Sequence, residues 1–190
     1  MPKLPPKDYI QATEFPSAIS LHPIGVVRSP YTERHGTPRQ SRLKAQPEDY
    51  TPAIAQIELF PNLVPAIALK DLDGFDYLWV ISWLHLNRHW NPTVIPPRGP
   101  KIRRGTLATR APHRPNPIGL SAVKLLQVEA SALQVEGIDL LDNTPVLDIK
   151  PYVSYCDALP EANCGYVSEL EREGEREVDI FGNDGHPERR

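Results

Sequence analysis

The chain has 190 residues, 40% hydrophobic and 24% charged, which is enough for one globular domain with its own core. A net charge of −3 gives no global sign of nucleic-acid binding, and two cysteines exclude a disulfide framework and indicate a reducing, cytoplasmic location. No apolar run is long enough to cross a membrane and no signal-peptide core is present, so no membrane association is expected.

Prolines and apolar alternation define the elements expected in the first half of the chain. The 22 prolines disfavour long helices and favour short strands with rigid connections. A nearly continuous apolar run over 77–86, rich in aromatic and β-branched residues, is typical of a buried central strand. The other predicted elements are a loose arm over 1–18, a strand over 24–29, a polar loop over 30–40, a strand over 55–60 and a short helix over 62–75.

Four strands are expected in the second half, over 104–110, 120–130, 132–141 and 145–153. The second and third of these strands would pair as a hairpin through Ser131 and its neighbours.

Side-chain parity adds detail to the last two strands. The apolar residues stand at odd positions before Gly137 (Leu133 and Val135) and at even positions after it (Ile138 and Leu140). This switch predicts a β-bulge or a sharp bend at Gly137. Alternation in the final strand predicts Leu147 and Ile149 inward, with Asp148 and Lys150 together on the outer face.

Six or seven short strands with little helix predict a mainly β protein, either a small closed barrel or a sandwich. From Asp157 onward the sequence is polar and acidic, with a weak pattern that fits either disorder or an edge segment. Three parts are therefore expected: an N-terminal arm over 1–18, a barrel domain over 19–156 and an acidic tail over 157–190.

Charge is distributed unevenly along the chain. The segment 98–124 holds seven basic residues and no acidic one, whereas 157–190 holds ten acidic residues against four basic ones. Because fields decay within about 8–10 Å in physiological salt, a local basic cluster can bind anions despite the negative total. The alternative for this segment is a solvated loop without a ligand.

Most common catalytic and metal-binding motifs are missing. The sequence has no GxGxxG or Walker loop for phosphates, no GxSxG elbow and no HExxH helix. His85 and His89 stand four residues apart, but they bridge a strand end and a loop, and Cys156 and Cys164 lack zinc spacing. No metal is therefore expected.

Four segments carry a resemblance to a known family: "TPRQ" (37–40), "WLHLNR" (83–88), "ATRAPHRPNPIG" (108–119) and "GIDLLDNTPVLDIKPY" (137–152). In sequence, order and spacing the chain resembles the TsaA-like, or TrmO, family of tRNA methyltransferases from about residue 24 to 155. The resemblance implies a small closed β-barrel of non-Rossmann type with short helices, S-adenosylmethionine (SAM) as cofactor, and a homodimer.

The resemblance also implies the reaction. Family members methylate N6 of the threonylcarbamoyl-modified adenosine next to the tRNA anticodon. Many bacterial members carry an additional C-terminal domain that assists tRNA binding, whereas this chain is expected to rely on its basic segment. The alternative is a non-catalytic barrel that binds SAM or a nucleic acid, because barrels of this size often bind oligonucleotides without chemistry.

By resemblance, ten residues are expected to contact the cofactor. Pro115 and Pro117 restrict the backbone around Asn116, whose amide offers both a donor and an acceptor to an adenine ring. Asp139 would take ribose hydroxyls or lie near the sulfonium, and Arg110 would pair with the methionyl carboxylate or with a tRNA phosphate. The full set is Pro38, Arg39, Gln40, His85, Leu86, Arg110, Asn116, Leu120, Ile138 and Asp139.

The expected catalytic residues are Asp142, Lys150 and Tyr152. N6 of the modified adenosine belongs to a urea-like group and is a poor nucleophile, so a base should help, and Asp142 is favoured over Asp148. Lys150 would stabilise the carbamoyl oxygen or the threonyl carboxylate, and Tyr152 would donate to either. The alternative for Asp148 and Lys150 is a surface ion pair worth under about 1 kcal/mol. The residues expected to contact tRNA are Arg103, Arg104 and Arg114.

Overall fold

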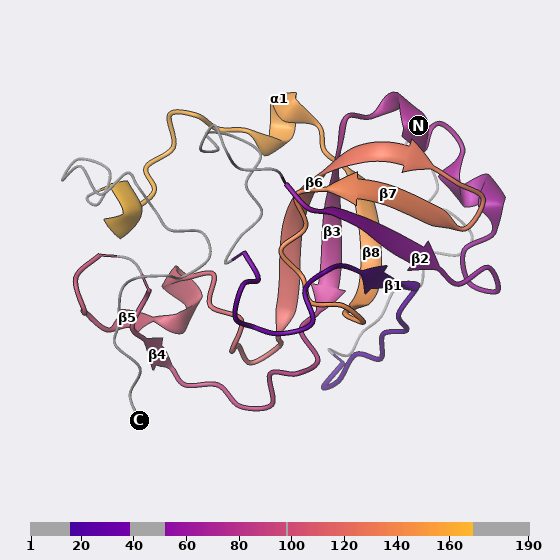
Figure 1. Cartoon of the computed structure of the whole chain (residues 1–190). Helices are drawn as coiled ribbons and strands as arrows, with labels where there is room; N and C mark the ends of the chain where they lie inside the picture. Colours follow the sequence, from indigo (N-terminus) through magenta and orange to yellow (C-terminus); the bar gives the residue numbers. More distant parts are fainter. Residues whose placement is uncertain (1–15, 39–51, 98, 169–190) are drawn as a thin grey trace, which may run out of the picture.

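A computed structural model of the chain describes residues 16–38, 52–97 and 99–168 (Figure 1). Six antiparallel strands close into a barrel in the order β1-β2-β7-β6-β3-β8, so the predicted closed barrel is confirmed. The barrel strands are β1 Gly25–Arg28, β2 Ile54–Leu59, β3 Tyr77–Trp83, β6 Ile118–Val128, β7 Ala132–Glu136 and β8 Pro145–Pro151.

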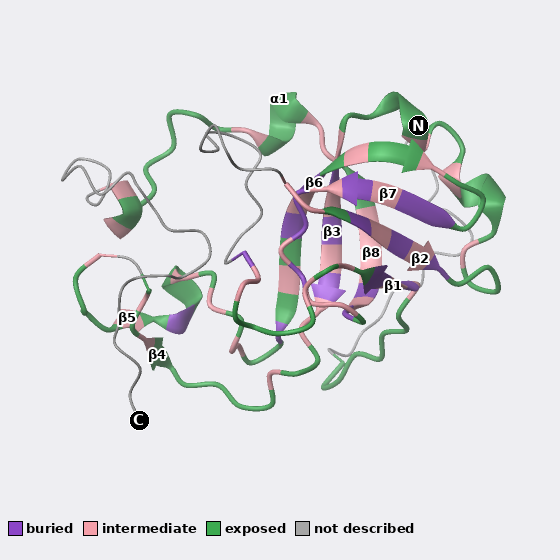
Figure 2. Ribbon diagram, in the orientation of Figure 1, coloured by how far each residue is buried: buried purple, intermediate pink, exposed green. Residues whose placement is uncertain are grey.

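Alternation of buried and more exposed residues, clearest in β3, explains how these segments close around one core. In β3 every second residue is buried, and its inward side chains face inward residues of β6 across the register pairs Leu78–Val123 and Val80–Ser121. Figure 2 shows the buried residues concentrated on the barrel strands. The core is made of Val27, Ala55, Ile57, Leu59, Leu78, Val80, Val123, Leu133, Val135, Ile138, Leu140 and Val146.

The barrel has two unlike ends. At one end β1, β3 and β7 finish and β2, β6 and β8 begin, so the three connections between them start and end there; their described parts are 29–38, 52–53, 84–97, 99–117 and 137–144. We call this the loop-rich end. The other end carries the connection between β2 and β3 and the tight β6–β7 hairpin. In the hairpin Glu129 donates its N–H to the carbonyl of Ala132, and Leu59 of β2 donates to the carbonyl of Ser131.

The connection 84–117 includes an arm that projects away from the barrel (Figure 1). In this basic arm, which we define as residues 88–114, β4 Thr93–Val94 pairs with β5 Arg104–Gly105, and the 3-10 turn η3 Thr106–Ala108 follows. Thr106 is buried and its hydroxyl donates to the carbonyl of Asn91. Arg114 Nη1 donates to the carbonyls of Thr106 and Thr109, at 3.2 and 2.7 Å, so its guanidinium helps to hold the arm in shape.

Three predicted elements are wrong in detail. Instead of one helix over 62–75 the chain forms two 3-10 turns, η1 Ala66–Leu69 and η2 Leu72–Gly74, because Asp71 between them adopts a left-handed φ of 66°. The strand expected over 104–110 stops at Gly105, where η3 takes over. The long apolar run predicted as a strand over 77–86 ends at Trp83.

The predicted bend at Gly137 is confirmed. This residue has a φ of 84°, which favours glycine, and β7 ends immediately before it. As a result, the strand predicted over 132–141 is shorter than expected, and Ile138 and Leu140 reach the core from a loop.

The inward direction predicted for Leu147 is also wrong. The β3–β8 register pairs Ile81 with Asp148 and Ser82 with Val146, so Leu147 is the extra residue of a bulge. Val146 takes the inward position and is fully buried. After the bulge Ile149 packs against the core, and Asp148 and Lys150 share the outer face as predicted, joined by an ion pair of 2.7 Å.

A short helix, α1 Ser154–Asp157, is fastened to the outer face of the barrel. Asp157 Oδ2 accepts hydrogen bonds from the backbone N–H of Val153, at 2.8 Å, and from Trp79 Nε1, at 2.9 Å. Both bonds favour the charged carboxylate, so the pKa of Asp157 lies below its ordinary value, with the Val153 bond as the larger cause.

This lowered pKa predicts a pH-dependent stability. The contribution of Asp157 is present above the ordinary carboxyl pKa and is lost as the pH falls through the lowered folded-state pKa. We therefore expect Asp157→Asn to reduce the difference in free energy of unfolding between pH 7 and pH 3, measured by urea denaturation. Glu161→Gln, at an exposed carboxylate in the same segment, is the control. An unchanged pH dependence in Asp157→Asn would contradict the expectation.

Candidate functional site

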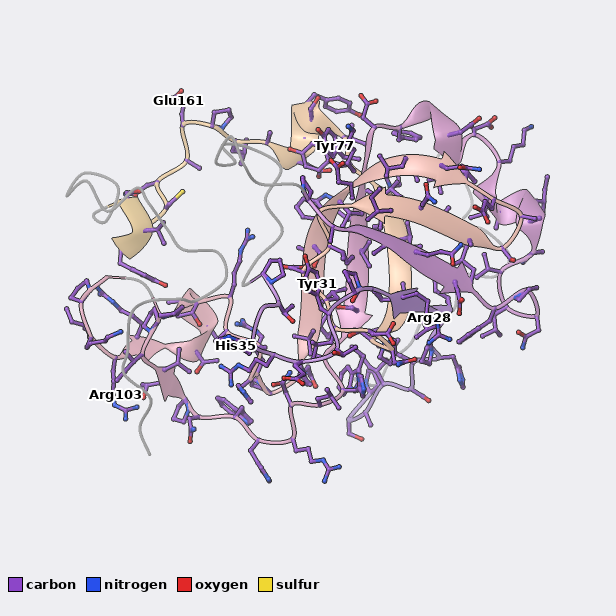
Figure 3. All side chains as sticks on the ribbon, in the orientation of Figure 1. Arg28, Tyr31, His35, Tyr77, Arg103 and Glu161 are labelled. Carbon is purple, nitrogen blue, oxygen red and sulfur yellow. The ribbon has the colours of Figure 1, made fainter. Side chains whose placement is uncertain are left out.

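Three connections that carry predicted site residues meet the start of β6 at the loop-rich end. The strand order places the connections after β1, β3 and β7 there, beside the start of β6. In Figure 3 Tyr31 and His35 lie on the side of the barrel that faces the basic arm. Segments that are far apart in the sequence therefore line one end of the barrel.

The end of β3 and the start of β6 are held together closely. Leu84 donates its backbone N–H to the carbonyl of Pro117 at 2.7 Å, which continues the pairing beyond the strands. Below this bond, Ser82 and Gly119 face each other in the register. A Cβ on Gly119 would lie 2.4 Å from Ser82 Oγ and 3.2 Å from Leu84 Cδ2, so a larger residue there would force these side chains to shift.

The loop after β7 is anchored on both sides. Ile138 and Leu140 are buried in the core, and the hydroxyl of Ser29 donates to the carbonyl of Leu140 at 2.8 Å. Between these anchors, Oδ1 of Asp139 accepts a hydrogen bond from the hydroxyl of Ser121 on β6 at 2.5 Å. This hydrogen bond joins the loop to the start of β6.

The carboxylate of Asp142, the predicted base, accepts hydrogen bonds from two neighbouring residues of the chain. Its Oδ1 accepts from the backbone N–H of Ser29 at 3.2 Å, and its Oδ2 accepts from the side-chain amide of Asn143 at 2.7 Å. Asn143 in turn accepts from Arg28, which also pairs with Glu58 at 2.7 Å. This network joins the end of β1 to the connection before β8, so Asp142 has a structural role whatever else it does.

The predicted cofactor residues fall into three groups. Pro38 is buried in the connection after β1, and Arg39 and Gln40 lie outside the described residues. Exposed side chains line the β3–β6 corner, where Leu86 is 63% and Leu120 is 55% exposed. The remaining members are His85, Asn116 and Arg110, which are exposed, Asp139, which is half-buried, and Ile138, which is a core residue.

The outer face of β6, β3 and β8 places some of these residues in rows. Leu120, Ile81 and Asp148 form one row, and Ala122, Trp79 and Lys150 form the next. From the strand spacing, the Asp148–Lys150 ion pair lies roughly 10 Å from Leu120 on the same face.

Tyr152 lies beyond these rows, at the other end of the barrel. Its backbone N–H donates to the carbonyl of Tyr77, a residue that is labelled in Figure 3. Its ring packs against the ring of Trp79, with 5.4 Å between the centroids.

Two polar residues of this end were not singled out from the sequence. Ser82 and Ser121 are inward-facing hydroxyls in a barrel that is otherwise apolar, and both are buried. Ser121 bonds Asp139, whereas Ser82 Oγ has no hydrogen-bond partner in the described structure. Their position among alternating apolar residues was the available signal, since buried hydroxyls in a core are uncommon.

The contact between Ser82 and Gly119 predicts that mutations of these two residues have coupled effects on the free energy of unfolding. Gly119→Ala should lower the free energy of unfolding by about 2 kcal/mol, because the new methyl group overlaps the hydroxyl. Ser82→Ala should raise the free energy of unfolding by up to about 1 kcal/mol, because it removes a buried group without a partner. In the double mutant the overlap is gone, so urea denaturation should show a coupling of more than about 1 kcal/mol. Simple additivity would contradict this packing.

Two arginines of the basic arm, Arg103 and Arg104, contact residues outside the barrel strands. Arg103, labelled in Figure 3, lies at the far side of the arm and donates to Thr93 Oγ1 at 3.4 Å. The guanidinium of Arg104 stacks over the ring of Tyr166, 4.7 Å from its centroid. This contact fixes the segment that follows α1 against the arm.

Within the described ranges, no three His, Cys, Asp or Glu side chains are grouped so as to hold a metal ion. The same ranges contain no helix with the length and apolarity needed to span a bilayer. Cys156 and Cys164 are free and exposed.

A family model describes the tRNA-methyltransferase O N-terminal domain, and it matches residues 26–158, which include the whole barrel from Val26 onward. The chain belongs to this family. The tRNA (adenine(37)-N6)-methyltransferase of Escherichia coli (strain K12) is 39% identical over 158 residues, which are 80% of this chain and 65% of that protein. The chain therefore spans about two thirds of that relative's length.

Other family members show the same relationship. A probable S-adenosyl-L-methionine-binding protein of Methanothermobacter thermautotrophicus is 40% identical over 141 residues, 74% of this chain and 95% of that protein. The crystal structure of TrmO from Pseudomonas aeruginosa matches with a TM-score of 0.64 and 40% identity, over 78% of this chain and 62% of that chain. The resemblance to the family predicted from the four sequence segments is thus confirmed.

Proposed function

We propose that this chain is a SAM-dependent methyltransferase that modifies N6 of adenosine 37 in tRNA, and that its substrate carries the threonylcarbamoyl group. The observation that carries the proposal is the arrangement at the loop-rich end of one barrel, where the connections after β3 and β7 meet the start of β6. Support comes from the names of relatives, which include tRNA (adenine(37)-N6)-methyltransferases of Escherichia coli and Homo sapiens.

The residues at this end fit the cofactor. Leu86 and Leu120 expose apolar side chains at one corner, which suits the face of an adenine ring. Asn116, held between two prolines, offers a donor and an acceptor to the ring edge. Asp139 supplies a fixed carboxylate for hydrogen-bond donors. Calorimetry should show SAM binding in the micromolar range, about −8 kcal/mol.

Bound SAM supplies a methyl group on a positively charged sulfur. The residues of the chain then have to orient the acceptor nitrogen in line with that methyl group and remove its proton. We assign the base to Asp142 and the stabilisation of the developing charge to Lys150 and Tyr152. Lys150 already carries a counter-charge in Asp148, which would hold its ammonium in place until substrate arrives.

The tRNA surface and the oligomeric state belong to the same proposal. Arg103 and Arg104 lie on the basic arm, outside the cofactor corner, and suit phosphate contacts. Because Tyr152 lies at the end of β8 away from Leu86, we propose a symmetric homodimer in which a second copy brings these groups together.

The dimer is directly measurable. Sedimentation at micromolar concentration should give twice the 21.3 kDa of one chain. A monomer under these conditions would contradict a site shared between copies.

The substrate is tested by methyl transfer from labelled SAM to two matched tRNAs. One carries threonylcarbamoyl-adenosine at position 37 and the other carries unmodified adenosine. We expect label in the first tRNA only. Label in both would remove the threonylcarbamoyl requirement, and label in neither, with SAM bound, would favour a non-catalytic SAM-binding module.

A further inference from the structure

The basic arm presents one exposed tryptophan. Trp90 is the only Phe, Tyr or Trp residue within 88–114, a segment that holds seven arginines and lysines and no acidic residue. It is 46% exposed, and within the described ranges its indole has no hydrogen bond, aromatic contact or cation–π contact. Trp79 on the barrel differs, because its ring packs on Tyr152 and its Nε1 donates to Asp157.

Hydrogen bonds fix the backbone on both sides of Trp90. Before it, the carbonyl of His89 lies 3.1 Å from Nδ1 of His113. After it, the carbonyl of Asn91 accepts a hydrogen bond from the hydroxyl of Thr106, which is buried. A side chain on a backbone that is already held loses less conformational freedom when it binds a ligand. The arm therefore offers the indole as a pre-positioned apolar surface.

The same part of the arm places positive groups around this surface. The carbonyl of Thr106, beside the backbone that follows Trp90, accepts from Nη1 of Arg114 at 3.2 Å. Arg103 donates to Thr93 Oγ1 from the strand opposite. Cations attract the phosphates of a nucleic acid, and an aromatic ring among them can stack on a base. A duplex keeps its bases stacked on one another, so this combination suits unpaired bases.

Trp90 also lies near the cofactor corner along the chain. It follows Leu86 by four residues, so the two Cα atoms are at most about 14 Å apart. The proposed function brings adenosine 37, an unpaired base of the anticodon loop, to this corner. The neighbouring bases of the loop are then close to the start of the arm, where the indole is exposed.

We propose that Trp90 stacks on an unpaired base of the tRNA anticodon loop, beside the adenosine that is methylated. The arm then contacts the loop through two kinds of group. Its arginines bind phosphates, which gives an affinity that depends on salt, and its indole binds a base, which gives a preference for unpaired RNA over duplex. The inference rests on the proposed function, because it takes tRNA as the substrate.

The test is fluorescence anisotropy of the full chain with two labelled RNAs, the anticodon stem-loop of a tRNA and a fully paired duplex with the sequence of that stem. Wild-type protein should bind the stem-loop about tenfold more tightly than the duplex. Trp90→Ala should weaken stem-loop binding about tenfold and leave duplex binding unchanged. The slope of log affinity against log salt should also stay unchanged, because no charge is removed.

Two further variants complete the design. Ile95→Ala changes an apolar residue of the same arm that is 45% exposed, and it should bind both RNAs as the wild type does. Trp90→Phe keeps a ring that can stack, so its stem-loop affinity should stay within about threefold of the wild type. The stem-loop should quench the tryptophan fluorescence of the wild type and not that of Trp90→Phe. This quenching decides the inference even if Trp90→Ala does not fold.

Five outcomes overturn the inference. Unchanged stem-loop binding by Trp90→Ala removes the role, as does quenching that persists in Trp90→Phe. Equal weakening of stem-loop and duplex by Trp90→Ala would assign the residue to a contact with the RNA backbone. The same loss in Ile95→Ala would show a general effect of apolar side chains on the arm. A change from dimer to monomer in sedimentation of Trp90→Ala would assign the indole to the contact between copies.

Failure of the inference is distinguishable from failure of the proposed function, because RNA binding is measured without SAM. Methyl transfer to tRNA by the wild type, with RNA binding that does not depend on Trp90, removes the inference alone. Stem-loop binding that depends on Trp90, without methyl transfer, removes the proposed activity alone. Absence of binding to either RNA by the wild type overturns both the tRNA substrate and the inference.

Discussion

Gly25→Ala should lower the free energy of unfolding by about 3 kcal/mol, among the largest effects expected of a single methyl group in this chain. Gly25 pairs with Leu59 of β2 and with Val146 of β8, so it sits between two neighbours at the closure of the barrel. A Cβ there would lie 2.3 Å from the carbonyl oxygen of Glu58 and 3.2 Å from Cα of Leu59. Both are backbone atoms, and they cannot move without breaking the β1–β2 pairing.

Gly74→Ala is the matched control for this mutation. A Cβ at Gly74 meets nothing within 4 Å, so the free energy of unfolding should change by less than about 0.5 kcal/mol. Urea denaturation measures both variants. Equal stability of Gly25→Ala and Gly74→Ala would mean that β1 is not held between β2 and β8.

Replacing Arg103 and Arg104 together by alanine should weaken tRNA binding strongly. Each lost phosphate contact should also reduce the slope of log affinity against log salt by about one unit. SAM affinity should stay unchanged, because both residues lie on the basic arm and away from the cofactor corner. Lys70→Ala, at an exposed lysine beside η1 on the barrel, is the control and should leave tRNA affinity and salt slope as they are.

Removal of residues 169–190 is expected to have the opposite effect on tRNA binding. Truncation after Ser168 removes eight acidic and four basic residues, a net loss of four negative charges, so tRNA binding should be equal or stronger. This cut leaves the Asp157–Trp79 bond and the Arg104–Tyr166 contact in place. A sharp loss of tRNA binding on truncation, with the arginine variants unaffected, would make the segment a docking element and the arm only structural.

Much of the fold could be predicted because β-strands carry a local signal. Apolar runs rich in β-branched and aromatic residues predicted the segments of β2, β3 and β6, and the change of the apolar positions at Gly137 predicted a bend that the backbone confirms. The family segments predicted the family and the closed barrel, both of which are confirmed.

What could not be predicted depends on pairing between strands. The bulge that turns Leu147 away and Val146 inward exists only because β8 pairs with β3 in one particular register. The two turns in place of a helix over 62–75 depend on a left-handed Asp71, which no periodicity shows. The hydrogen bond between Ser121 and Asp139, eighteen residues further along the chain, depends on the fold and has no signal in the local sequence.

The proposed methyltransferase activity is tested most directly by mass analysis of tRNA nucleosides. The purified chain is incubated with SAM and with tRNA that carries threonylcarbamoyl-adenosine, and the tRNA is then digested to nucleosides. We predict that the threonylcarbamoyl-adenosine gains the mass of one methyl group, that the methyl group lies on N6, and that omission of SAM abolishes the product. An unchanged nucleoside, from protein that binds both SAM and tRNA, would contradict the proposed function and leave a barrel that binds without catalysing.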